Sequence, residues 1–308
     1  MTDQKSISMQ AWGLLLLLGI IWGASFVSIR VALDEIGFLT TVAHRTFWAM
    51  LALWIVVLVM RLPIPREPRI WGAFFVMGLL NNVIPFGLMA WGQLHIESGL
   101  TSILNAATAI FGVLMAALFF ADERLTLRKL AGVLLGFAGV ATAIGLENLR
   151  SFSLQSLAQL AVIGGTLSYA LAGVWARKNL AGLKPQVAAA GMLTGSTLIT
   201  VPLAFMFDGP VTLLLEPRTI AAIGYFSIIA TAGAYLLYYQ VLALAGSGNL
   251  LLVTLLIPPV AIVLGALMLG EALHAGAYAG FALLACGLGI LDGRLLKGLQ
   301  RSAPVRTD

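Results

Sequence analysis

Long apolar runs, separated by short polar segments, extend along almost the whole chain. These runs show no alternation of apolar and polar residues with a period of two, so the pattern favours helices over strands. A bilayer core of about 30 Å takes roughly 20 apolar residues in a helix. We therefore expect an all-α polytopic membrane protein with ten transmembrane helices. They are predicted at residues 11–33, 40–61, 70–94, 99–120, 127–146, 154–176, 185–207, 217–243, 249–270 and 275–296.

The chain also contains an internal repeat. Glu123 and Glu271 each follow an apolar run and lie 148 positions apart, and paired glycines follow in the same register. A unit of five helices ends on the opposite side of the membrane from its start, so its copy is inserted upside down. The sequence predicts two inverted five-helix repeats, at residues 1–146 and 147–298, and a cytoplasmic tail at 299–308. Repeats of this kind are typical of secondary transporters, whose substrate site lies between the repeats.

Composition agrees with a membrane location. The chain is 60% hydrophobic and 10% charged, with a mean hydropathy of +0.99. A core of 308 residues cannot hide that much apolar surface, so the lipid bilayer is the expected partner. Its single cysteine, Cys286, excludes an intramolecular disulfide and a thiolate metal cluster.

The basic residues predict the orientation. With both termini in the cytoplasm, fourteen of the eighteen lysines and arginines lie in cytoplasmic segments, as the positive-inside rule requires. The sequence pI near 9.6 is then a topology signal, and no nucleic acid is expected as a partner. We expect a multi-pass protein of the bacterial inner membrane.

Motifs of enzymes are missing from the sequence. The histidines His44, His95 and His274 fall near predicted helix ends and form no HExxH pair. No phosphate-binding GxxxxGK[ST] loop is present, so ATP does not drive the chain directly. We therefore predict no enzyme activity, no catalytic residue, no metal and no cofactor.

The acidic residues all fall in tails, in loops or near helix ends. Proton-driven carriers often use a carboxylate inside the membrane as a relay, and such a residue is kept only where it is used. The sequence therefore favours a facilitator or exchanger of neutral or zwitterionic solutes.

The remaining polar and aromatic groups inside the spans predict a substrate site. Amides and hydroxyls can hydrogen-bond both ends of a zwitterion, and ring faces attract an ammonium. Backbone carbonyls freed by prolines can do the same. The candidate substrate-binding residues are Trp22, Asn82, Pro85, Met89, Gln93, Asn105, Thr108, Ser168, Tyr169, Tyr235, Tyr239, Thr254 and Pro258.

Structural roles for the same residues stay open at this stage. Amides and hydroxyls in membrane helices commonly tie helices together, and prolines can be packing kinks only. Arg45 also has two interpretations, because it can extend to the lipid headgroups at the end of its span or act inside the bundle.

Several motifs together resemble those of the drug/metabolite transporter superfamily, in its ten-helix EamA-type branch. They are Trp22-Gly23, Arg45, Glu123-Arg124-Leu125, Pro258-Pro259 and Gly270-Glu271, and the likeness covers about residues 11–296. One departure is Ile110-Phe111, which stands where this family often has the proline that the second repeat retains.

The resemblance implies two inverted five-helix repeats and export of amino acids or related metabolites, with the aromatic amino acid exporters as the most similar type. It also implies a structural or gating role for Arg45. We expect a monomer or weak dimer that exports small-molecule substrates, namely amino acids, by alternating access. An exporter of drugs or other small metabolites is the alternative.

Overall fold

The computed structural model describes residues 8–121, 123, 125–145, 153–210, 214–250 and 253–292. Within these ranges every regular element is a helix. The first half of the chain comprises α1 (Met9–Leu33), α2 (Phe38–Val59), α3 (Pro68–Gly78), η1 (Leu79–Val83), α4 (Ile84–Gly92), α5 (Ser98–Asn105), α6 (Thr108–Phe119) and α7 (Leu127–Ile144). The second half comprises α9 (Leu154–Asn179), α10 (Pro185–Phe207), α11 (Pro217–Gly224), η2 (Tyr225–Gly233), α12 (Ala234–Leu250), α13 (Val253–Leu269) and α14 (Ala275–Asp292).

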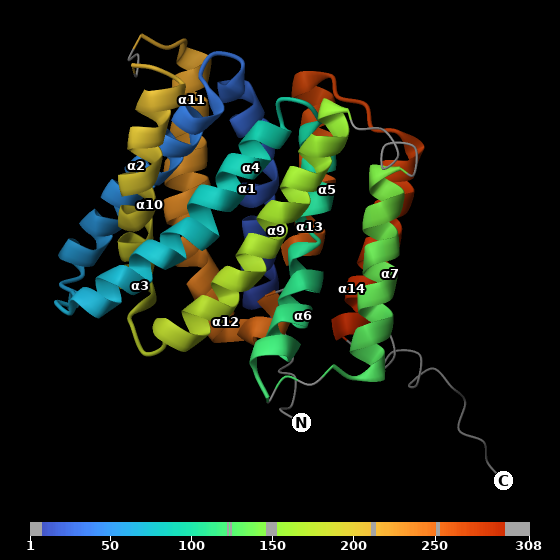
Figure 1. Ribbon diagram of the computed structural model, residues 1–308, viewed down its shortest axis with the longest axis horizontal. Coiled ribbons are helices and arrows are strands. Elements are labelled where there is room, and N and C mark those ends of the chain that lie inside the picture. The colour runs from blue at the N-terminus through green and yellow to red at the C-terminus, as the bar shows by residue number, and fades with distance from the viewer. Residues whose placement is uncertain are drawn as a thin grey trace.

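These helices form ten spans, because α3–η1–α4, α5–α6 and α11–η2–α12 each continue across the bundle as one unit (Figure 1). Eight spans in the described residues are long and apolar enough to cross a membrane, and α13 and α14 are shorter apolar helices. The predicted all-α fold is thus confirmed. The predicted boundary between the repeats, at 146 and 147, and the tail at 299–308 lie outside the described residues.

Most predicted span boundaries agree with the structure within a few residues, with one clear correction. The eighth span was expected to end at 243 and the ninth to begin at 249, whereas α12 runs to Leu250 and α13 begins at Val253. The Ala-Gly-Ser-Gly-Asn segment at 245–249 suggested a loop, because Gly and Ser are weak helix formers. The helix continues through it.

Helix starts follow from local chemistry. Ser8, Thr126 and Ser153 accept hydrogen bonds at the N-termini of α1, α7 and α9, where the first amides lack partners inside the helix. Proline begins α3, α10 and α11, because a missing N–H costs nothing in the first turn of a helix. Two of these starts share the tripeptide Glu-Pro-Arg, at 67–69 and 216–218.

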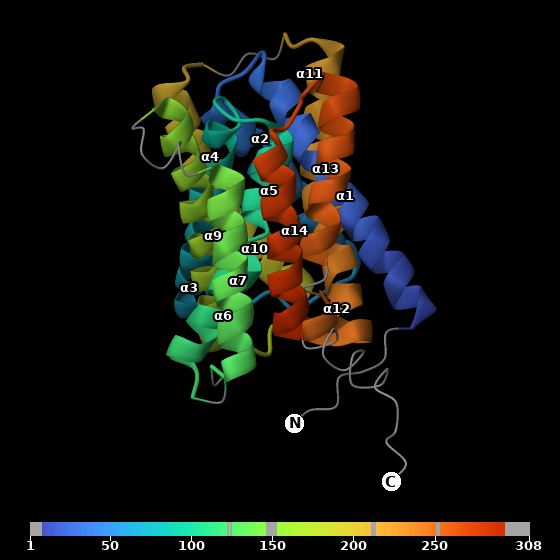
Figure 2. The same cartoon turned by 90° about the vertical axis from the view of Figure 1, so that its right-hand side faces the viewer.

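The glycines of the repeat form the interface between α7 and α14. A Cβ on Gly132 would lie 2.8 Å from the Gly287 carbonyl oxygen, and one on Gly139 would lie 2.7 Å from the Gly280 carbonyl oxygen. As residue numbers rise along α7 they fall along α14, so these equivalent helices of the two halves run antiparallel (Figure 2). Small residues let the two backbones approach this closely.

The other helices follow the same inverted plan. α2 and α10, also equivalent, run antiparallel, because Thr46 contacts Thr200 and Trp54 contacts Thr194. The first span of each half, α1 or α9, packs on the third and fourth spans of the other half. The two halves are therefore inverted repeats whose third spans lie next to the other half.

Candidate substrate site

The third span of each half contains a π-helix. η1 lies between α3 and α4, and η2 lies between α11 and α12. The repeat offset of 148 places residues 79–83 on 227–231, which lie inside η2. Wider turns of this type leave carbonyls without the usual helical donor and often occur at functional sites.

Each π-helix receives a side-chain donor from the first span of the opposite half. Ser168 Oγ on α9 donates to the Leu80 carbonyl in η1, at 2.6 Å. Trp22 Nε1 on α1 donates to the Ala230 carbonyl in η2, at 3.1 Å. Two of the residues predicted from the sequence therefore contact the widened turns, at the junction between the two halves.

A polar cluster adjoins η1. It consists of Asn81, Asn82, Ser196, Tyr235 and Met192, and we call it the asparagine cluster. Asn82 is fully buried, and its Nδ2 donates to Ser196 Oγ at 2.8 Å. Its Oδ1 accepts from the Tyr235 hydroxyl and from Asn81 Nδ2, each at 3.1 Å. Asn81 is half-buried and its Nδ2 also lies 3.4 Å from Met192 Sδ.

A cavity of about 180 Å³ leads toward this cluster between α9, α10 and α12. It begins at the α9–α10 turn, at Leu180 and Leu183, and reaches Met192 and Tyr239. Met192 lies seven residues after the start of α10, which is about 10 Å along the helix. The α9–α10 turn lies at the end of the bundle where α1 begins and α14 ends (Figure 1). Met192 is the residue of the asparagine cluster that lines this cavity.

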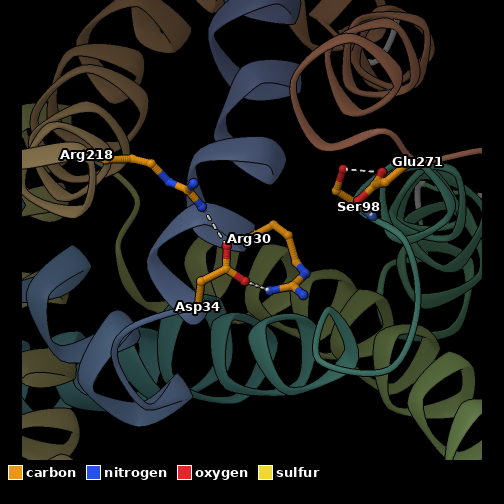
Figure 3. A network of polar contacts seen from close by, with 5 residues as sticks. All are labelled: Arg30, Asp34, Ser98, Arg218 and Glu271. Atoms are coloured by element: carbon orange, nitrogen blue, oxygen red, sulfur yellow. Dashed lines mark hydrogen bonds and ion pairs between the residues drawn. The ribbon is translucent and has the colours of Figure 1, made fainter. Parts of the chain in front are cut away.

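The opposite end of the bundle is held by polar contacts between the halves (Figure 3). Asp34, after α1, pairs with Arg30 at 2.6 Å and with Arg218 of α11 at 2.7 Å. Nearby, Glu271 accepts from Ser98 Oγ at 2.7 Å and from the Ser98 amide at 2.9 Å. Each exposed pair contributes only about 0–1 kcal/mol, but together they connect both halves at this end.

Glu123, the repeat equivalent of Glu271, makes a different set of contacts. Its carboxylate lies 3.1 Å from Lys129 Nζ, in the same half, and 4.0 Å from an Arg177 nitrogen. The two ends of the bundle are therefore asymmetric: Glu271 holds the start of α5, while Glu123 pairs with cations.

The other predicted residues lie around this centre at various distances. Tyr235 belongs to the asparagine cluster, and Tyr239 lines the cavity. The Tyr169 ring contacts Phe86 edge-on, with 6.5 Å between centroids. Pro85 follows η1 and is buried at the start of α4, next to Gly165.

Five predicted residues lie away from the asparagine cluster. Met89 is buried in an apolar core with residues of α5, α6 and α7. Asn105 and Thr108 flank the break between α5 and α6, where Thr108 Oγ1 donates to the Asn105 carbonyl at 2.7 Å. Thr254 and Pro258 lie on α13, which packs on α1.

Gln93, the last predicted residue, ends α4 and is fully buried with no partner for its amide among the described residues. Gln159 of α9 is also buried, and its amide has no hydrogen-bond partner among the described residues. Because α4 and α9 pack against each other, these two amides lie in the same region of the bundle.

Sequence reasoning missed Ser196 and Met192, which contact the two asparagines from α10. A serine and a methionine in an apolar run carry no signal of their own. It also left the role of Arg45 open. The guanidinium contacts Thr231 and the Phe86 ring inside the bundle, so the extension of Arg45 to lipid headgroups is wrong.

Comparison with known proteins identifies a family and several relatives. The model of the EamA-like transporter family matches twice, at residues 10–145 and 156–291. A probable terminal-alkyne amino-acid exporter of Streptantibioticus cattleyicolor is 28% identical over 96% of this chain and 97% of its own length. A probable amino-acid metabolite efflux pump of Escherichia coli is 26% identical over 89% of this chain and 92% of its own.

A third relative and a solved structure complete the comparison. An uncharacterized transporter of Bacillus subtilis is 21% identical over 87% of this chain and 92% of its own length. One crystal structure superposes with a TM-score of 0.65 over 92% of this chain and 96% of that chain, at 16% identity. This last likeness concerns the fold alone.

Proposed function

This chain belongs to the EamA-like transporter family, and on that premise we propose that it exports amino acids by alternating access. Membership in the family makes it a multi-pass membrane transporter of small molecules. Beyond this, we propose that the substrates are amino acids, that transport is outward and that the two halves alternate in exposing the site.

One observation carries the mechanism. The cavity extends from the α9–α10 turn to Met192 of the asparagine cluster, while ion pairs and hydrogen bonds connect the halves at the other end of the bundle. In a protein built from inverted repeats, each half can adopt the conformation that the other half had. This change closes the open end of the bundle and opens the closed end. A solute that enters the cavity can therefore leave on the other side without a continuous pore.

The chemistry of the cluster supports amino acids. Asn81, Asn82 and Tyr235 offer amide and hydroxyl groups, which donate to a carboxylate and accept from an ammonium. Two relatives are named as exporters of amino acids or their metabolites, which agrees with this class of substrate. Export of drugs or other metabolites is the second candidate, favoured by Tyr239, which lines the cavity, and by the rings of Tyr238 and Trp22, which contact it in succession.

The proposed driving force is exchange or the substrate gradient. Within the described residues the ion pairs lie at the ends of the bundle, and no carboxylate lies midway along a span. Without an acidic relay inside the membrane, coupling to protons is not expected.

We further propose a location in the bacterial inner membrane with both termini in the cytoplasm, as a monomer or weak dimer. The cavity then opens to the cytoplasm, the side from which an exporter takes up its substrate. A cysteine replacing Gly209, in a Cys286→Ser background, should react in intact cells with a thiol reagent that cannot cross the membrane. One replacing Arg66 should react only after lysis, and the reverse pattern would contradict the orientation.

Export itself is tested in cells that overproduce the chain. Cells fed with dipeptides accumulate free amino acids, and the chain should raise the rate at which these appear in the medium. The control is the same strain carrying the vector without the gene. Equal efflux from both strains, with normal protein levels, would overturn the proposal.

A further inference from the structure

Arg45 is a basic residue deep in a membrane span. It lies two turns into α2, about 10 Å along the helix from Phe38. Its side chain is half-buried. Because charged residues inside spans are costly, they usually line a substrate pathway or pair with another polar group.

The guanidinium lies between the third spans of the two halves. Its Nε donates to Thr231 Oγ1 in η2 at 2.9 Å, and its Cζ lies 3.9 Å from the centroid of the Phe86 ring in α4. Thr231 Oγ1 in turn donates to the Phe226 carbonyl at 2.7 Å, a contact that fixes the threonine rotamer. The hydrogen bond to Thr231 and the contact with the Phe86 ring together fix the position of the guanidinium.

The terminal nitrogens of Arg45 have no hydrogen-bond partner among the described residues. Only Nε is engaged, although a guanidinium has five N–H donors in a fixed fork. None of the carboxylates in the described ion pairs contacts it, since those pairs involve Asp34 and Glu123 at the ends of the bundle. A positive charge with four free donors is therefore presented between the halves.

The groups around Arg45 connect it to the asparagine cluster. Tyr235 lies four residues, about one turn, after Thr231 in the same span, and its hydroxyl donates to Asn82. Tyr169 packs edge-on against Phe86, the ring beneath the guanidinium. The Thr231 hydroxyl and the Phe86 ring thus contact the guanidinium, and Tyr169 and Tyr235 lie next to these two residues.

We propose that Arg45 binds the α-carboxylate of the transported amino acid through its two terminal nitrogens. The proposal rests on the function proposed above and specifies one contact within that site. Arginine matches a carboxylate with two parallel hydrogen bonds, which gives both strength and orientation. The ammonium of the substrate then faces Tyr235, whose hydroxyl oxygen can accept a further hydrogen bond, and the ring of Tyr169. Arg45 thereby distinguishes amino acids from amines and amides of the same shape.

A purely structural role for Arg45 predicts something different. If Arg45 only connects α2 to η2 through Thr231, its replacement should lower the affinity for every substrate by the same factor. The contrast between substrates with and without a carboxylate therefore separates the two roles, whereas transport activity alone does not.

The test uses purified chain in liposomes and competition against uptake of radiolabelled L-leucine and L-phenylalanine. The competitors are L-phenylalanine, L-phenylalaninamide and 2-phenylethylamine, which share a ring and an amino group and differ in the carboxylate. The variants are Arg45→Gln and Arg45→Lys. Arg66→Gln, which removes a cation from an exposed loop, is the matched control.

In the wild-type chain and in Arg66→Gln, the amino acid should compete at least tenfold better than the amide or the amine. In Arg45→Gln that preference should disappear, because the affinity for L-phenylalanine falls by roughly 30-fold while that for the amide changes little. Arg45→Lys should retain part of the preference, since a point charge remains but the fork is lost.

An unchanged preference in a folded Arg45→Gln, or an equal loss for acid and amide, overturns the assignment. If Arg45→Gln does not fold, two other results decide. An unchanged preference for L-phenylalanine over the amide in Arg45→Lys overturns the assignment, and so does the absence of that preference in the wild-type chain. Failure of the wild-type chain to transport either amino acid would overturn the proposed function itself, which is a different result.

Discussion

Asn82 allows a quantitative test of the asparagine cluster. Asn82→Leu keeps the number and branching of the side-chain heavy atoms but removes one donated and two accepted hydrogen bonds, to Ser196, Tyr235 and Asn81. Because the side chain is fully buried, water cannot replace the lost partners. The variant therefore leaves three polar groups to find other partners inside the bundle.

The expected loss follows from these three bonds. Hydrogen bonds between membrane helices contribute about 0.6 kcal/mol on average, and those in soluble proteins about 1 kcal/mol. The variant should lose about 2–3 kcal/mol in total, shared between the stability of the folded chain and the binding of substrate. If half of this loss concerns binding, the affinity falls about tenfold, since 1.4 kcal/mol corresponds to a factor of ten.

Both parts can be measured on the purified chain. Substrate concentration at half-maximal counterflow gives the affinity, and thermal unfolding in detergent gives the stability. Gln240→Leu, which replaces an exposed amide on α12, is the matched control and should change neither. A lower unfolding temperature with unchanged affinity would mean that Asn82 only ties helices together, and the reasoning about the site would be refuted.

Three further perturbations test other parts of the structure. Glu271→Gln removes the negative charge that accepts hydrogen bonds from Ser98 at the start of α5. The local stability there should fall by about 1–2 kcal/mol, so hydrogen exchange of these amides should accelerate about 5–30-fold. Unchanged exchange would contradict the role of the carboxylate. Gly139→Val places a side chain against the Gly280 carbonyl, so the yield of folded chain should fall strongly, and a normal yield would count against the close packing of α7 on α14. Met192→Trp fills the inner end of the cavity and should exclude bulky amino acids before small ones, which a comparison of L-alanine and L-tryptophan transport would reveal.

The spans and the inverted repeat could be predicted because each rests on a local or periodic signal. Continuous apolar runs mark the spans, and the paired glycines around 132 and 280 mark the repeat. The same glycines form the contact between α7 and α14, so a sequence signal and a packing feature coincide. Only the α12–α13 boundary differed clearly, where tertiary packing overrides weak helix propensity.

The details of the site depend on contacts that no local pattern contains. The π-helices depend on donors from distant helices, since Trp22 reaches Ala230 across 208 positions of the sequence. The break between α5 and α6 at Ala106 and Ala107 has no proline or glycine to announce it. Arg45 was visible in the sequence, but its partners Thr231 and Phe86 are brought to it only by the fold.

Counterflow by purified chain in liposomes tests exchange by alternating access directly. Liposomes loaded with an unlabelled neutral amino acid and diluted into a trace of the same labelled amino acid should accumulate the label transiently. The account predicts saturable accumulation that persists when an uncoupler abolishes any proton gradient. Uptake without saturation and without counterflow would indicate a channel, and a strict requirement for a proton gradient would contradict the proposed exchange.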